Sequence, residues 1–158
     1  MPDAPLILCY DGSADAKHAI QRGIELLAAR RALVLTVWLP TAVLGPGLGE
    51  TVAMVNFAEL DRAAAEEGDR IAAEGTRIAQ AAGLDAQPLA VKADGPVWHT
   101  IVETADRCDA AAIAMGSRGL TPLRSILLGS VSTGVVHHAD RPTLVIRRPS
   151  QDDDPQAA

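Results

Sequence analysis

Short apolar runs alternate with longer segments of helical periodicity, and this alternation is the feature that most restricts the fold of the chain. Strands separated by helices indicate βαβ units and a parallel sheet, whose covered strands are continuously apolar. Five strands are expected, at residues 6–10, 32–38, 85–91, 110–115 and 143–147. The sequence therefore predicts an α/β fold with a five-stranded parallel sheet.

Four helices are expected between these strands, because apolar or small side chains recur there at helical spacing. Ser13 is placed to cap the first helix, and Gly83 to end the second in a left-handed conformation. Pro96 suits the first turn of the third helix. The other three helices are expected at residues 16–27, 56–82 and 130–139.

The composition favours one domain with a finely packed core. Hydrophobic residues make up 48% of the 158 positions but aromatic residues only 3%, so small aliphatic side chains must build the core between closely packed helices. This domain is expected over residues 1–148. Residues 149–158 carry three aspartates and little apolar surface, which predicts a disordered acidic tail.

Charge and cysteine content exclude several classes of protein. The net charge of −6 argues against a nucleic-acid surface, which would need clustered basic residues. Cys9 and Cys108 are too few for a disulfide framework, which favours a reducing compartment. The sequence shows neither a signal peptide nor an apolar run of membrane-spanning length. A cytoplasmic protein without nucleic-acid or membrane partners is expected.

A glycine-punctuated loop links the fourth strand to the fourth helix. Gly116, Gly119 and Gly129 lack a Cβ, so the backbone can take left-handed conformations and approach a ligand closely. Ser130 and Ser132 stand at the helix start, where they can cap the helix or bind an anion. Free N–H groups and the helix dipole favour an anion there, so the loop is predicted to cradle phosphate.

The spacing Gly-x2-Gly-x9-Gly-Ser, from Gly116 to Ser130, resembles the ATP-binding signature of the universal stress protein family. Asp11-Gly-Ser, Thr36-Val-Trp and Arg141-Pro-Thr-Leu-Val-Ile-Arg also fall where that family has equivalents. The resemblance covers almost the whole chain apart from the acidic tail. It implies a Rossmann-like sheet of strand order 3-2-1-4-5 with helices on both faces. Ligands bind such sheets where the winding direction reverses, beyond the carboxyl ends of the first and fourth strands.

The resemblance also implies the ligand and its neighbours. The ligand would be ATP, or AMP or another adenine nucleotide, with Mg²⁺ beside the phosphates. Asp11 would reach the adenosine end, away from the cradle, because a carboxylate repels phosphate. The backbone of Val37 would border adenine, and Met115 and Val131 would flank the nucleotide. Arg118 and Arg124 either neutralise phosphate or are simply solvated, as arginines on exposed loops usually are.

The resemblance implies a nucleotide-dependent regulator of the stress response. The sequence offers no set of carboxylates and water-positioning groups for fast hydrolysis, and it indicates no catalytic residue and no metal site. One alternative is a slow ATPase, or a self-phosphorylating protein that uses Ser117, Ser130 or Ser132 as acceptor. The other is an interaction module that binds no nucleotide.

Three further expectations concern the surface. The apolar edge strand Thr143–Ile146 is expected to form a homodimer by antiparallel pairing, as similar domains of the family commonly do. The glycine-rich segment 40–52 is a candidate lid. His137 and His138 are expected as cations at a helix carboxyl terminus, where no third ligand completes a metal site.

Overall fold

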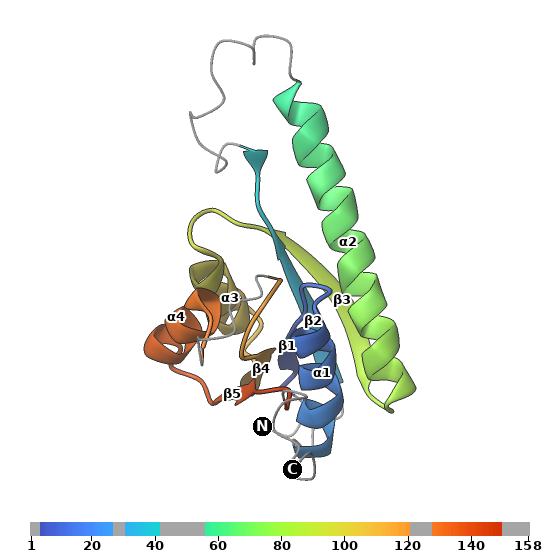
Figure 1. Cartoon of the computed structure of the whole chain (residues 1–158), viewed down its shortest axis with the longest axis vertical. Helices are drawn as coiled ribbons and strands as arrows, with labels where there is room; N and C mark the ends of the chain where they lie inside the picture. Colours follow the sequence, from blue (N-terminus) through green and yellow to red (C-terminus); the bar gives the residue numbers. More distant parts are fainter. Residues whose placement is uncertain (1–3, 27–30, 42–55, 121–127, 150–158) are drawn as a thin grey trace, which may run out of the picture.

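The computed structural model describes residues 4–26, 31–41, 56–120 and 128–149, which form five strands and four helices (Figure 1). The strands are β1 (Leu6–Cys9), β2 (Arg31–Trp38), β3 (Asp85–Lys92), β4 (Ala112–Gly116) and β5 (Thr143–Ile146). The helices are α1 (Ala14–Leu26), α2 (Phe57–Ala81), α3 (Val97–Arg107) and α4 (Ser130–His138). The candidate lid beyond Thr41, Arg124 and the acidic tail from residue 150 lie outside the described residues.

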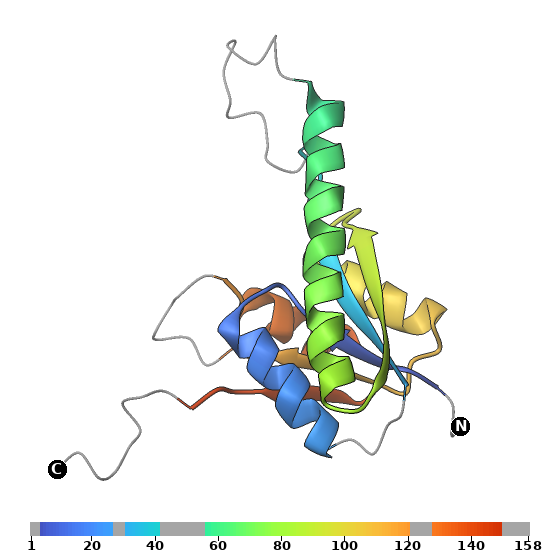
Figure 2. The ribbon, with the colours of Figure 1, turned by 90° about the vertical axis from the view of Figure 1, so that its right-hand side faces the viewer.

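The strands form one parallel sheet in the order β3-β2-β1-β4-β5, which confirms the predicted topology. Helices α1 and α2 cover one face, and α3 and α4 the other (Figures 1 and 2). Successive side chains of a strand point to opposite faces, so Leu6 and Leu8 enter the core beneath α1 and α2 while Ile7 enters the core beneath α3 and α4.

Glycines allow the close helix packing that the aromatic-poor composition predicts. A Cβ on Gly75 of α2 would lie 2.6 Å from the ring of Tyr10, and one on Gly134 of α4 would lie 2.3 Å from the ring of Trp98. Trp98 also stacks on the imidazole of His138, with ring centroids 4.2 Å apart. The few large rings therefore lie against bare helix backbone.

Local signals set most element ends. The side chain of Asn56 accepts a hydrogen bond from the Glu59 amide at the start of α2, and Gly83 has a φ of +96° at its end, as predicted. The expected start of β4 at Ala110 is wrong. The Ala110 amide donates to Ala105 O (2.9 Å) and closes the end of α3, so β4 begins at Ala112.

The order of the strands makes β1 and β4 neighbours at the centre of the sheet, so the chain reverses its winding between them. β5 forms one edge of the sheet, and α2 extends beyond the carboxyl ends of the strands (Figure 1). Both cysteines are free, as expected. In the described part of the chain, no helix combines the length and the apolar character needed to cross a membrane.

Candidate functional site

A cleft of about 630 Å³ opens at the carboxyl ends of the central strands, where the winding reverses. Its wall contains all ten residues singled out from the sequence: Asp11, Val37, Met115, Gly116, Arg118, Gly119, Gly129, Ser130, Val131 and Ser132. Eight further described residues line the wall: Cys9, Tyr10, Ala16, Leu35, Leu39, Val97, Ile101 and Leu120. The tertiary structure thus brings together four separate stretches of sequence.

The two carboxylate oxygens of Asp11 lie against different parts of the chain. Its Oδ1 atom accepts a hydrogen bond from the Ser13 amide (3.0 Å), and Ser13 Oγ in turn accepts one from the Ala16 amide (3.1 Å), which caps α1. Its Oδ2 atom lies 2.7 Å from where a Cβ would stand on Gly119. The expectation that Asp11 lies away from the glycine loop is therefore wrong at the Gly119 end.

The glycines of the loop serve close approach rather than left-handed conformation. Gly116, Gly119 and Gly129 have no positive φ, so of the two possibilities that a missing Cβ allows, the structure uses close approach. A Cβ on Gly116 would meet the Asp15 carbonyl carbon at 3.0 Å and the Ala16 nitrogen at 3.1 Å. The end of β4 can therefore touch the start of α1 only without a side chain at Gly116.

The two ends of the glycine loop are joined at Ser117. Its carbonyl oxygen accepts hydrogen bonds from the Gly129 amide (2.8 Å) and from Ser132 Oγ (3.0 Å). Leu128, the residue before Gly129, is 38% exposed. Hydrogen bonds to the Ser117 carbonyl therefore join the described ends of the loop.

The first turn of α4 carries no side-chain cap. Its N-cap residue is Gly129, and Ser132 Oγ points back to Ser117 O and Gly129 O, so the expected capping by Ser130 or Ser132 is wrong. The first N–H groups of a helix have no partner within the helix. Together with the helix dipole, these amides make the wall beside Ser130 and Val131 suitable for an anion.

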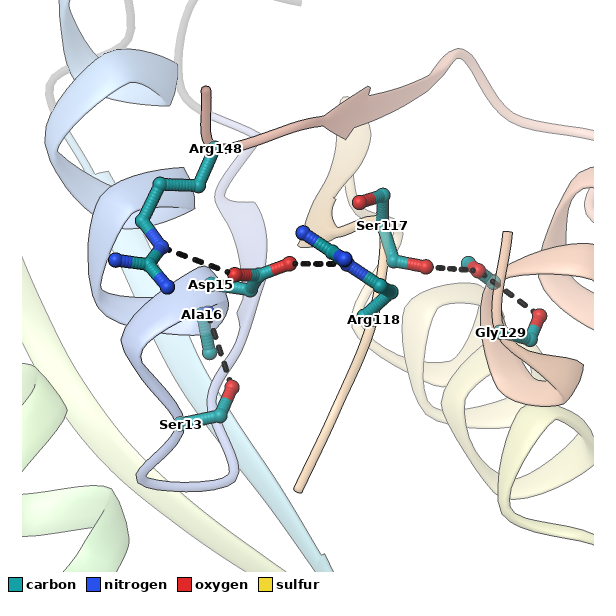
Figure 3. Close-up of polar contacts among 8 residues, drawn as sticks. Ser13, Asp15, Ala16, Ser117, Arg118, Gly129 and Arg148 are labelled. Carbon is teal, nitrogen blue, oxygen red and sulfur yellow. Dashed lines mark hydrogen bonds and ion pairs between the residues drawn. The ribbon is translucent and has the colours of Figure 1, made fainter. Parts of the chain in front are cut away.

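Arg118 enters the cleft wall while paired with a buried carboxylate. Its Nε lies 3.1 Å from Asp15 Oδ2, and Arg148 Nε lies 3.2 Å from the other oxygen of the same carboxylate (Figure 3). Arg118 is therefore not the freely solvated arginine that one interpretation of the sequence expected. Neither Asp15 nor Arg148 carried a recognisable signal, because they lie 103 and 133 positions from their respective partners.

The inner wall of the cleft is apolar. Leu35 and Val37 of β2, Met115 of β4 and Ile101 of α3 supply most of it. Cys9 also lies there, and burial, reinforced by the Asp11 charge, raises the pKa of its thiol to about 12. The thiol therefore stays protonated at neutral pH and contributes to packing rather than to nucleophilic chemistry. Sequence analysis did not identify Ile101 as a cleft residue, because periodicity does not indicate which part of a helix covers a cleft.

A second group of polar side chains lies outside the cleft. Asp94, His99 and Glu103 are exposed, and their nearest ligand atoms lie within 4.8 Å of one another. Sequence analysis did not identify this group, although the i,i+4 spacing of His99 and Glu103 on α3 could have indicated that those two side chains are neighbours. His137 and His138 occupy the last turn of α4, as expected.

Comparison with known proteins agrees with this architecture. The model of the universal stress protein family matches residues 5–147. A universal stress protein of Thermus aquaticus is 31% identical over 144 residues, which cover 90% of this chain and 97% of the relative. The solved structure of UspA from Lactobacillus plantarum superimposes with a TM-score of 0.71 at 20% identity, covering 92% and 98% of the two chains. The structure of an Archaeoglobus fulgidus universal stress protein in complex with dAMP gives a TM-score of 0.61 at 22% identity, with 92% and 99% covered.

Proposed function

Because the chain belongs to the universal stress protein family, we propose that its cleft binds an adenine nucleotide, with ATP as the preferred ligand, and that binding regulates its interactions in the stress response. The observation that carries this proposal is that one cleft wall combines two kinds of chemistry. It holds apolar side chains and the Asp11 carboxylate, and it also holds Arg118 and the first turn of α4, which has no side-chain cap.

These two kinds of lining residue match the two chemically different parts of a nucleotide. Leu35, Val37 and Ile101 offer apolar surface for a base, and a carboxylate oxygen such as that of Asp11 accepts hydrogen bonds from ribose hydroxyls or an amino group. The amides of α4 and the guanidinium of Arg118 suit phosphate. The dAMP held by the Archaeoglobus fulgidus relative supports an adenine nucleotide as ligand.

The wall of the cleft suits binding better than fast hydrolysis. Among its described residues Asp11 is the one carboxylate, and one of its oxygens already accepts the Ser13 amide, so the wall offers no carboxylate pair for Mg²⁺. The ion would reach this site on the phosphates of ATP. We expect less than roughly one turnover per minute, far below the usual enzyme range of about 1 to 1,000 per second.

Burial restricts the self-phosphorylation alternative. Ser117 and Ser132 are buried in the described structure, whereas Ser130 is exposed at the start of α4. Ser130 is therefore the one acceptor of the three that a phosphoryl donor could reach without local opening. Loss of incorporated phosphate in Ser130→Ala would support that alternative over simple binding.

We also propose a cytoplasmic homodimer that pairs through β5. Support comes from the position of β5 at an edge of the sheet, where one row of its backbone groups has no strand of the described residues beside it. The two free thiols suit a reducing compartment.

Calorimetric titration with ATP, GTP, adenosine and inorganic triphosphate tests nucleotide binding. We expect the tightest binding for ATP, since the phosphate end is generic and the Asp11 end reads the base or ribose. Equal affinities for ATP and GTP would contradict the adenine assignment. An absence of binding by all four ligands would favour the interaction module without nucleotide.

A further inference from the structure

A buried carboxylate beside the cleft binds two arginines from distant parts of the chain. Asp15 is 7% exposed, lies in the first turn of α1, and receives Arg118 from the glycine loop and Arg148 from the segment after β5 (Figure 3). Three elements that converge on the phosphate end of the cleft therefore share one ionic cluster, defined here as Asp15, Arg118 and Arg148.

The helix itself does not require this arrangement. Ser13 Oγ already caps the first turn of α1 through the Ala16 amide. The bare Cα of Gly116 brings the end of β4 against the backbone of Asp15, which fixes the carboxylate next to the loop. Asp15 is thus placed to hold Arg118 rather than to complete the helix.

Within the described part of the chain, the ion pair engages one N–H group of the Arg118 guanidinium. The contact with Asp15 uses Nε, and a guanidinium carries four further N–H donors on its two Nη atoms. Arg118 supplies the one positive side chain among the described residues of the cleft wall. With two arginines on one carboxylate, the cluster keeps a net charge of +1, so it attracts an anion.

We propose that Asp15 is a positioning residue for anion binding: it fixes Arg118 at the phosphate end of the cleft so that the Nη donors meet an anionic group. This inference rests on the proposed function in taking that group to be the phosphates of a nucleotide. Fixing the side chain beforehand reduces the rotamer entropy that Arg118 would otherwise lose on binding.

The variant Asp15→Asn distinguishes a positioning role from a simple effect of charge, because the two predict opposite changes in the affinity for an anion. Asp15→Asn removes a negative charge near the site, which by itself would strengthen anion binding. If Asp15 positions Arg118, the same variant lets the two arginines repel each other and weakens binding. We expect the Kd for ATP to rise about five- to tenfold, a change of the size that one oriented charge-assisted contact supplies. The Kd for adenosine should stay within about twofold.

Matched variants separate positioning from structural damage. Asp69→Asn removes one negative charge from an exposed site on α2 and should leave both affinities unchanged. In an Arg118→Gln background, Asp15→Asn should have no further effect on ATP, because the side chain that it positions is gone. Unchanged or tighter ATP binding in Asp15→Asn, or equal losses for ATP and adenosine, would overturn the inference.

Two further measurements test the positioning role of Asp15 without an adenine ligand. In the ligand-free protein, the Arg118 Nε–H resonance should be protected from solvent exchange and should lose this protection in Asp15→Asn. Inorganic triphosphate should bind more weakly to Asp15→Asn than to the unmodified protein. If the unmodified protein binds triphosphate but neither ATP nor adenosine, and Asp15→Asn weakens triphosphate binding, the proposed function is refuted. The positioning role of Asp15 is then still supported. An unprotected Arg118 Nε–H in the unmodified protein would refute the positioning role itself.

Discussion

The Oδ2 atom of Asp11 lies 2.7 Å from the point where a Cβ would stand on Gly119, so the loop after β4 rests against the carboxylate that follows β1. The other oxygen of Asp11 accepts the Ser13 amide and restricts the carboxylate. The absence of a side chain at Gly119 therefore sets where the free oxygen of Asp11 lies in the cleft.

Gly119→Ala should displace the Asp11 carboxylate without unfolding the protein. The added methyl would stand too close to Asp11 Oδ2, but this atom ends a flexible side chain that can shift, so the stability loss should stay below about 1 kcal/mol. We expect adenosine and ATP to lose affinity by the same factor, measured by calorimetry. Gly95→Ala is the control, since a Cβ there meets nothing within 4 Å. Unchanged adenosine affinity would remove Asp11 from the adenosine end.

Gly129→Val should abolish triphosphate binding while the protein remains folded. A Cβ at Gly129 has ordinary contact distances, the nearest being 3.5 Å to Ser117 O, but a β-branched side chain at the N-cap crowds the first amides of α4. ATP and inorganic triphosphate should lose binding, and adenosine should keep it. Circular dichroism checks the fold, and Gly129→Ala should show a smaller loss. Normal triphosphate affinity in the folded valine variant would contradict the phosphate cradle.

Val145→Pro should convert the proposed dimer into a monomer. The carbonyls of Pro142 and Ile146 accept the amides of Ile113 and Ser117, and backbone groups alternate in direction along a strand, so the Val145 N–H points to the open edge. Proline deletes that donor without removing a hydrogen bond to β4, a position where edge strands tolerate it. Light scattering measures the assembly, with Val145→Ala as a control that keeps the N–H.

A monomeric unmodified protein at micromolar concentration would refute the dimer. A dimer that survives Val145→Pro would place the interface elsewhere.

Gly75→Ala should destabilise the protein by about 1–3 kcal/mol, the usual cost of overpacking a core. A methyl there would stand 2.6 Å from Tyr10 Cδ1 and 2.8 Å from Val34 Cγ1, both in the core beneath α2. The gain in helix propensity, about 0.5–1 kcal/mol, is too small to compensate. Urea denaturation followed by circular dichroism measures the change, and an unchanged midpoint would contradict the tight packing.

The single tyrosine should titrate far above its ordinary range. Burial, the hydrogen bond that Tyr10 donates to Glu74 Oε1 (2.8 Å) and nearby negative charge raise the pKa of Tyr10 from 10.0 to about 12. Because the folded pKa exceeds the unfolded one, the contribution to stability is complete below pH 10 and is lost as the pH rises through about 12. Absorbance at 295 nm after a rapid pH jump reports this ionisation before the protein unfolds. Glu74→Gln should lower the midpoint, and a midpoint near 10 in the unmodified protein would contradict the buried contact.

The elements themselves follow from local sequence. Apolar runs, helical periodicity and the residues at helix ends such as Asn56 and Gly83 act within a few positions, so they are readable without a tertiary structure. The strand order came from the family resemblance rather than from periodicity, because several topologies satisfy the same local pattern. The glycine loop and Asp11-Gly-Ser, by contrast, are local motifs, so they could be identified as candidate cleft residues from the sequence.

The tertiary structure determined which residues from distant parts of the chain contact those motifs. Asp15 meets Arg118 and Arg148 across more than 100 positions, Ile101 covers the cleft, and Trp98 stacks on His138. Such contacts depend on how each helix is rotated on the sheet and on which partner a charged side chain reaches. Only the packed fold determines this, because burial makes the competing arrangements of the same residues costly.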